Sequence, residues 1–273
     1  MITQSTSSQT SEVAFKVSAS YTNIIKIVID ADSLVYKSCY RHQLPDGGGV
    51  NIEQAYLEFG FEIGKIKSAV FRLLKYAKGD KVEPIIVLSP KRSFRHDLDE
   101  EYKGNRPTSE PIHGIKALKL MIMHRLKNAL VVKNVEADDV CIWFAQNKEY
   151  LISAIDKDVI NACPTSCYDY NKRRWESPHL PYEIEEWYTR QALMGDSTDN
   201  IKGAEGMGIE RSLRWISKFE GELYSWSEYC DLFGGEALAE QAMNLVRMDG
   251  LVRIDGKLIW KPWNISKSNY WEY

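Results

Sequence analysis

This sequence has few cysteines, no long apolar run and a small net charge. Five cysteines among 273 residues are an odd and sparse set, which excludes a disulfide-stapled small domain and favours reduced thiols. Cys163 and Cys167 have no second Cys or His pair nearby, so we expect no zinc site there. No apolar run approaches the roughly 18 residues that a membrane-spanning helix needs, so no membrane contact is expected.

The charge is nearly balanced, with 35 Lys and Arg against 38 Asp and Glu and a formal net charge of -3. On net charge alone, an ordinary soluble protein is the simplest interpretation. Residues 1–12 are rich in Ser, Thr and Gln and lack the basic start and apolar centre of a signal peptide. We therefore expect residues 1–20 to form a flexible tail and the protein to be cytoplasmic.

Strand and helix patterns alternate along much of the chain. Apolar runs predict buried strands near residues 24–29, 84–88 and 150–155. Helical patterns lie near residues 52–78, 111–128 and 137–148. This alternation predicts an α/β fold with a parallel sheet, and 44% hydrophobic residues are enough for a substantial core. Ligands of such sheets bind beyond the carboxyl ends of the strands.

Eight acidic residues fall in four short clusters, two of them directly after predicted strands. They are Asp30, Glu136, Asp138, Asp139, Asp156, Asp158, Asp196 and Asp199. Two carboxylates about 6 Å apart repel by roughly 0.7 kcal/mol in water and roughly 3 kcal/mol at an effective dielectric near 20. A fold that gathers eight of them needs cations, and Mg²⁺ prefers oxygen ligands. Without these eight acids, 35 basic residues face 30 acidic ones, and that excess suits a polyanionic substrate.

The spacing within the clusters indicates how the carboxylates point. Asp156 and Asp158 are two residues apart, so an extended backbone would place both on one face. Glu136 and Asp139 are three apart and share a face if a helix begins there. Each cluster taken singly is compatible with a solvated helix cap or turn. Their combination at strand ends and helix starts favours a metal site.

Two further segments carry features of nucleic-acid binding. Residues 91–106 combine five Lys and Arg residues with Phe94 and Tyr102. Basic side chains neutralise phosphates, and aromatic rings stack on bases. The alternative is a basic surface helix with an anchored aromatic side chain. Residues 200–209 form a Gly-rich turn before a helical stretch around 210–219, and unpaired N–H groups at such a turn can face an anion.

In order along the chain, five motifs resemble those of bacteriophage and bacterial 5′-nucleases, or flap endonucleases, a family that includes the 5′-nuclease domain of bacterial DNA polymerase I. The motifs are Ile27–Asp32, Phe94–Arg95 with Glu101–Arg106, Glu136–Asp139, Asp156–Asp158 and Gly195–Gly208. Together they cover roughly residues 24–220. The resemblance implies a PIN-like nuclease core over 21–190 with a helical arch near 91–130. It further implies a helix–hairpin–helix subdomain and C-terminal segment over 191–273.

The resemblance also implies roles for individual residues. The eight clustered acids would bind two Mg²⁺ ions, for which Mn²⁺ can substitute. Lys103 and Arg106 would act as catalytic residues on the scissile phosphate, and Tyr102 would stack on a nearby base. The implied DNA-binding set is Arg95, Tyr102, Lys103, Arg106, Lys202, Gly206 and Gly208. The hairpin would grip the duplex backbone, and a potassium ion there is a further expectation.

The implied function is a divalent-metal-dependent 5′-nuclease, a 5′-3′ exonuclease or flap endonuclease, in replication or recombination. Its partners would be DNA with 5′ ends, flaps or branches, RNA–DNA hybrids as a further substrate, and replication proteins. We expect a monomer, in the bacterial host cytoplasm if the source is viral. Two alternatives stay open. The hairpin argues against a PIN-type ribonuclease, and the retained acids argue against a non-catalytic DNA-structure-binding protein.

The sequence departs from the family pattern where an acid usually follows the second strand. Residues 87–94 contain no acid, and Ser89 or Pro90 occupies the expected position. We expect a water held by Ser89 to fill it, rather than a carboxylate from Asp97 or Asp99. Beyond residue 222 there is no family motif, and we expect the aromatic residues there to be packed core and tail. These are Trp260, Trp263, Tyr270, Trp271 and Tyr273.

Overall fold

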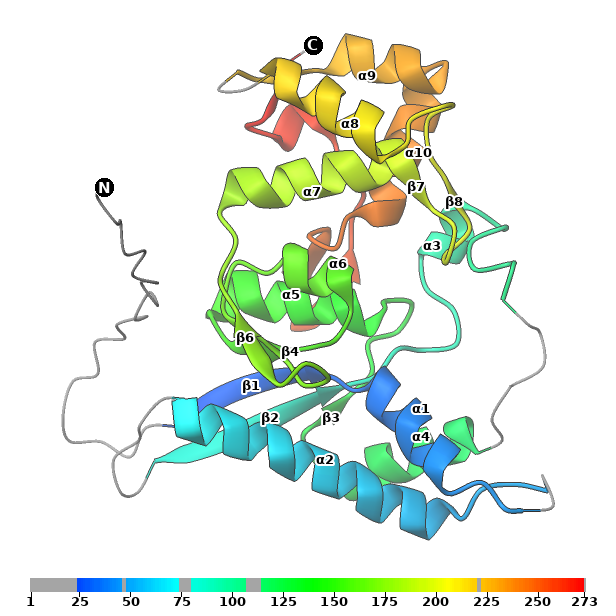
Figure 1. Ribbon diagram of the computed structural model, residues 1–273, viewed down its shortest axis with the longest axis vertical. Helices are drawn as coiled ribbons and strands as arrows, with labels where there is room; N and C mark the ends of the chain where they lie inside the picture. The colour runs from blue at the N-terminus through cyan, green and yellow to red at the C-terminus, as the bar shows by residue number, and fades with distance from the viewer. Residues whose placement is uncertain (1–23, 46–47, 74–79, 107–113, 220–221, 273) are drawn as a thin grey trace, which may run out of the picture.

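The computed structural model (Figure 1) describes residues 24–45, 48–73, 80–106, 114–219 and 222–272. Its centre is a six-stranded sheet in the order β3-β2-β1-β4-β5-β6. The strands are β1 (Ile24–Asp30), β2 (Lys81–Val87), β3 (Ala129–Leu130), β4 (Leu151–Ser153), β5 (Cys167–Asp169) and β6 (Arg174–Glu176). Neighbouring strands are parallel except for the antiparallel pair β5–β6. The predicted α/β fold with a mainly parallel sheet is therefore confirmed.

The middle strand β1 is buried on both faces. Ile27 and Ile29 pack into one hydrophobic cluster with α1 (Asp32–Arg41), α2 (Ile52–Leu73) and α4 (Ile115–Arg125). Val28, between them, points to the other cluster, with α5 (Ala137–Lys148). This alternation follows from the two-residue period of a strand and explains the continuous apolar run. Asp30 ends the strand where β1 pairs with Val87 of β2, so its side chain lies at the carboxyl edge of the sheet.

The elements not yet described, apart from α3, follow α5 in the chain, and most of them are drawn above α5 in Figure 1. They are α6 (Lys157–Asn161), α7 (Pro181–Met194), β7 (Gly195–Asp196), β8 (Ile201–Lys202), α8 (Ile209–Ile216), a 3₁₀ turn at Ser217–Phe219, β9 (Tyr224–Ser225), α9 (Trp226–Phe233), α10 (Glu236–Val246), β10 (Leu251–Ile254), β11 (Lys257–Trp260), a 3₁₀ turn at Ile265–Lys267 and β12 (Trp271–Glu272). Residues of α5, α7, α8, α9 and α10 share one hydrophobic cluster. The predicted boundary at residue 190 falls inside α7, and no separate core marks it among the described residues.

The segment expected to form a helical arch, 91–130, is only partly described. It begins with the single-turn helix α3 (Arg95–Leu98) and continues in turns to Arg106, while residues 107–113 lie outside the described residues. Helix α4 packs against α1 and α2, with Leu118 and Ile122 fully buried. The second half of the expected arch is therefore part of the layer that covers the sheet.

The aromatic residues near the C-terminus are packed, as expected. Trp271 is buried and lies against Trp226 and Tyr229. Trp260 stacks on Phe94, with ring centroids 4.1 Å apart. Tyr273 lies outside the described residues. Among the described helices, none has the length and apolar character needed to cross a bilayer.

Candidate metal and nucleic-acid site

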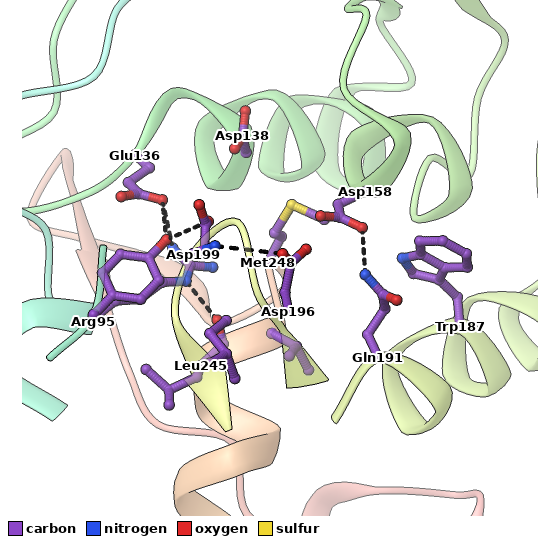
Figure 2. A pocket seen from close by; sticks show the side chains of 13 residues that line it. Arg95, Glu136, Asp138, Asp158, Trp187, Gln191, Asp196, Asp199, Leu245 and Met248 are labelled. Carbon is purple, nitrogen blue, oxygen red and sulfur yellow. Dashed lines mark hydrogen bonds and ion pairs between the residues drawn. The ribbon is translucent and has the colours of Figure 1, made fainter. Parts of the chain in front are cut away.

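The acidic clusters meet beyond the carboxyl edge of the sheet. Figure 2 shows a pocket whose lining includes acids from three clusters: Glu136, Asp138, Asp158, Asp196 and Asp199. The fourth cluster, Asp30, lies close enough to raise the pKa of Asp138 by charge repulsion. Segments from four parts of the chain therefore bring carboxylates to one place, as the topology of a parallel sheet predicts.

Asp30, Asp138 and Asp156 form the part of the site without an ion-pair partner among the described residues. Burial, reinforced by the charges of Asp32 and Asp156, raises the pKa of Asp30 to about 7. Burial and the charges of Asp30 and Asp156 raise the pKa of Asp138 well above its usual range. The raised pKa values of Asp30 and Asp138 show that their ionised forms are disfavoured here, and a divalent cation bound beside them would relieve this.

Glu136 and Asp199, in contrast, are paired with the basic segment. Lys103 Nζ lies 2.9 Å from Glu136 Oε1 and 3.5 Å from Asp199 Oδ2. Arg106 donates a short hydrogen bond to Asp199. Burial acts to raise the pKa of Glu136, but the charges of Arg95 and Lys103 outweigh it and lower the pKa to about 2. Lys103 and Arg106 are thus at the site, as the sequence predicts, with their charges directed at its acids.

Asp156 has extended backbone angles, but the helix α6 begins at Lys157, so the expected extended backbone through Asp158 is wrong. Asp156 is the N-cap of α6, and its carboxylate accepts the N–H of Asp158 at 2.7 Å. Asp158 is therefore in the first helical turn, where its carboxylate accepts Gln191 Nε2 at 2.8 Å. Burial and the charge of Asp156 raise the pKa of Asp158 to about 6. A helix cap satisfies the N–H groups that an extended segment would leave free.

Asp139 and Arg95 do not fit the roles expected of them. Arg95 holds both oxygens of Asp139, at 2.8 and 2.9 Å, and donates to the main-chain carbonyls of Leu245 (2.7 Å) and Arg247 (2.8 Å). The exposed fractions are 3% for Arg95 and 1% for Asp139. A guanidinium enclosed in this way is not available to DNA, nor is its carboxylate available to a metal ion. The pair instead connects α5 to the end of α10.

Tyr102 also differs from expectation. Its ring is 3% exposed and packs with Ile201 and Leu245, so it presents no face to a base. Its hydroxyl lies 3.0 Å from Glu136 Oε2 and 3.1 Å from Asp199 Oδ2. Burial of the aromatic ring, rather than stacking on a base, is what the anchored-aromatic alternative predicts.

The Gly-rich turn opens a helix, as expected, and Gly206 and Gly208 are exposed, but the N–H of Gly208 donates to the carbonyl of Gly206 at 3.2 Å instead of staying unpaired. Gly206 has φ +70°, which favours glycine, and its carbonyl accepts a hydrogen bond from Arg211. Gly208 is the N-cap of α8, and a Cβ there would meet nothing within 4 Å. Lys202, on β8, is 79% exposed at its side chain and pairs with Glu101. The turn lies between α7 and α8, which contact each other.

Comparison with known proteins identifies the family. Residues 26–188 match the family described as "5'-3' exonuclease, N-terminal resolvase-like domain". This chain belongs to the 5′-3′ exonuclease family. A 5′-3′ exonuclease of Buchnera aphidicola is 28% identical over 214 residues, 71% of this chain and 70% of that protein. The flap endonuclease of Escherichia phage T5 is 29% identical over 179 residues, 56% of this chain and 62% of that protein.

The fold agrees with this assignment. A crystal structure of the phage flap endonuclease in complex with DNA and metal ions has a TM-score of 0.53 and 20% identity, covering 82% of this chain and 89% of that one. Members of the 5′-3′ exonuclease family depend on divalent metal ions. The family assignment favours a 5′-nuclease over the PIN-type ribonuclease that the sequence left open.

The candidate metal ligands of this 5′-3′ exonuclease homologue are of the chemical type that a hard divalent ion binds. Every candidate ligand is a carboxylate, and Mg²⁺ prefers oxygen. Among the described residues, no three His, Cys, Asp or Glu side chains converge tightly enough to hold one ion by themselves. Mg²⁺ usually keeps several waters and takes only one or two protein carboxylates directly, so an open arrangement is compatible with it.

Sequence reasoning missed three side chains that contact the acids. Ser93 Oγ donates to Glu136 at 3.1 Å, Gln191 donates to Asp158, and Lys157 lies 3.3 Å from Asp196. Only Lys157 carried a signal, since it stands between two acids of the chain. Ser89, expected to hold a water, uses its hydroxyl to accept the N–H of Ala137 at 2.9 Å.

Proposed function

We propose that this protein is a divalent-metal-dependent 5′-nuclease that hydrolyses phosphodiester bonds of DNA, as a 5′-3′ exonuclease, a flap endonuclease or both, in replication or recombination. The observation that carries the proposal is the meeting of Asp30, Asp138 and Asp156 at the carboxyl edge of the sheet, where burial and their mutual charge outweigh the nearby Lys119 and Lys103 and raise the pKa of Asp30 and Asp138. A protein that only binds DNA gains nothing from carboxylates that repel one another. A metal-dependent hydrolase needs such carboxylates to bind its cations.

The metal-holding residues in this proposal are Asp30, Asp138 and Asp156, with Glu136, Asp158, Asp196 and Asp199 as further ligands, directly or through water. Bound Mg²⁺ ions, with Mn²⁺ as a substitute, supply Lewis-acid chemistry: they lower the pKa of water and stabilise a leaving oxygen. Asp139 has a different role here, because Arg95 occupies both of its oxygens.

Lys103 and Arg106 would stabilise the phosphate. Lys103 lies against Glu136 and Asp199, and Arg106 lies against Asp199; both acids line the pocket. A phosphate that enters beside a metal ion competes with these acids for the two cations. Charge-assisted hydrogen bonds from Lys103 and Arg106 would then strengthen as negative charge develops in the transition state.

The Gly-rich turn would bind the duplex backbone at a distance from the chemistry. Gly206 and Gly208 allow a phosphate to approach the N-terminus of α8, and Lys202 adds an exposed charge. K⁺ at this turn, RNA–DNA hybrids as substrates, replication proteins as partners and a monomeric state belong to the proposal as well. Its support is the family assignment and the exposed form of the turn.

The test is cleavage of 5′-end-labelled flap DNA and matching RNA, each with and without Mg²⁺, by the parent, Asp138→Asn and Asp97→Asn. Asp97 is a matched control because its carboxylate is 62% exposed and lies outside the pocket. We expect Mg²⁺-dependent DNA cleavage that Asp138→Asn abolishes and Asp97→Asn retains. Preferential cleavage of RNA would support a PIN-type ribonuclease. Binding of DNA without cleavage would support a structure-binding protein. Either result would overturn the proposal.

A further inference from the structure

The carboxyl end of β2 carries no acid of its own, yet a carboxylate lies there. Ser89, two residues beyond β2, donates its backbone N–H to Asp32 Oδ2 at 3.1 Å. Asp32 begins α1, and its own N–H donates to Asp30 Oδ1 at 3.3 Å. The Asp32 carboxylate therefore reaches from the end of β1 across to the end of β2, beside Asp30.

Lys119 lies against the same carboxylate. It extends from α4, with its Nζ 2.6 Å from Asp32 Oδ1 and 3.0 Å from the carbonyl oxygen of Ser89. The side chains of Asp32 and Lys119 are 31% and 26% exposed, so the pair faces solvent in part. Two chain segments thus hold Asp32 in place, the amide of Ser89 from one side and the ammonium of Lys119 from another.

We propose that Asp32 is a further metal-site residue, and that Lys119 occupies its carboxylate when no metal ion is bound. This inference rests on the proposed function. A partly exposed Lys–Asp pair is weak, because water and salt screen it, so a divalent ion at Asp30 can replace the ammonium at low cost. Asp32 would then bind the ion directly or one of its waters, and would provide at β2 the carboxylate that this strand lacks.

The alternative is that Asp32 and Lys119 form a pair that only supports the fold. The two roles predict different changes in metal affinity for variants of Asp32 and Lys119. If Lys119 competes with the metal ion, Lys119→Met frees Asp32 and tightens metal binding, whereas Asp32→Asn weakens it. If the pair is only structural, the two variants lower thermal stability together and leave metal affinity unchanged.

Metal binding is measured by titration calorimetry with Mn²⁺ alone and with Mg²⁺ alone, for proteins whose melting confirms that they are folded. We expect Asp32→Asn to weaken binding roughly tenfold, in the range found when groups around a metal site are removed. Lys119→Met should tighten it several-fold, and the double variant should bind like Asp32→Asn because Lys119 acts through Asp32. Equal affinities for all four proteins would overturn the inference.

Arg125→Met is the matched control. Arg125 also lies on α4 and also pairs with a carboxylate, Glu53 on α2, at 2.8 Å, but on the outer surface. Its loss should leave metal affinity unchanged. If the parent protein neither binds the ions nor cleaves DNA, the proposed function fails as well. If the parent binds the ions and cleaves DNA, but Asp32→Asn and Lys119→Met bind the ions as tightly as Arg125→Met, the role of Asp32 is refuted and the proposed function stands.

Discussion

Replacement of Arg95 tests whether a buried ion pair, rather than a DNA contact, is the role of this residue. Asp139 is 1% exposed, and Arg95→Met removes both hydrogen bonds that its carboxylate accepts from the guanidinium. Removing one partner of a buried pair destabilises a protein by about 3–5 kcal/mol, because a charge is left without compensation. The carbonyls of Leu245 and Arg247 also lose a donor, so we expect the upper part of this range.

Arg92→Met is the control from the same segment. Arg92 is 64% exposed and pairs with Asp97 at 3.6 Å. Such a surface pair contributes at most about 1 kcal/mol. The assay is urea unfolding without metal ions, which reports the free energy of unfolding from the midpoint and slope.

A second variant separates the ion pair from general damage to packing. Replacing both charges, in Arg95→Met/Asp139→Leu, should recover part of the loss, since apolar residues of similar size often replace buried pairs without penalty. The reasoning is refuted if Arg95→Met is as stable as Arg92→Met. A DNA-contact role would instead leave stability unchanged and lower the salt dependence of DNA binding.

Three further predictions concern the site itself. In the metal-free protein, burial raises the pKa of Asp30 to about 7 and that of Asp158 to about 6, so both keep their protons longer when folded than when unfolded. Their contribution to stability is present below about pH 4 and lost as the pH rises through 6 and 7; urea midpoints should therefore fall across this window, and added Mg²⁺ should reverse the trend because it binds the ionised form. A flat profile without metal would contradict these shifts. Asp156→Asn should lower cleavage by orders of magnitude while DNA binding in Ca²⁺ persists or improves, since repulsion with phosphate is reduced; turnover near that of the parent would remove Asp156 from the site. Lys103→Ala should slow single-turnover cleavage more than it weakens binding, whereas Gly208→Val should weaken binding more, because its added side chain points into open space where the duplex would approach. Effects of both changes on binding alone would contradict this division of roles, and melting of each variant checks the fold.

The sequence by itself determined the layers of the fold and the place where the acids meet. The apolar runs predicted at 24–29, 84–88 and 150–155 fall on β1, β2 and β4, which each contain buried residues, and such a run is a property of neighbouring residues. Parallel strands end at one edge, so acids that follow β1 and β4 must come together there. Both conclusions need only local patterns and a topological rule.

Only the tertiary structure decided which charged side chains are free. Arg95 and Tyr102 belong to a basic, exposed-looking segment, yet both are buried because α10 lies against them. The acceptor that encloses Arg95 is the carbonyl of Leu245, 150 residues further along the chain. A local pattern cannot report such a partner, because burial depends on which distant segment covers a side chain. For the same reason Asp32 was not among the predicted site residues, and only the fold places the amide of Ser89 and the ammonium of Lys119 against it.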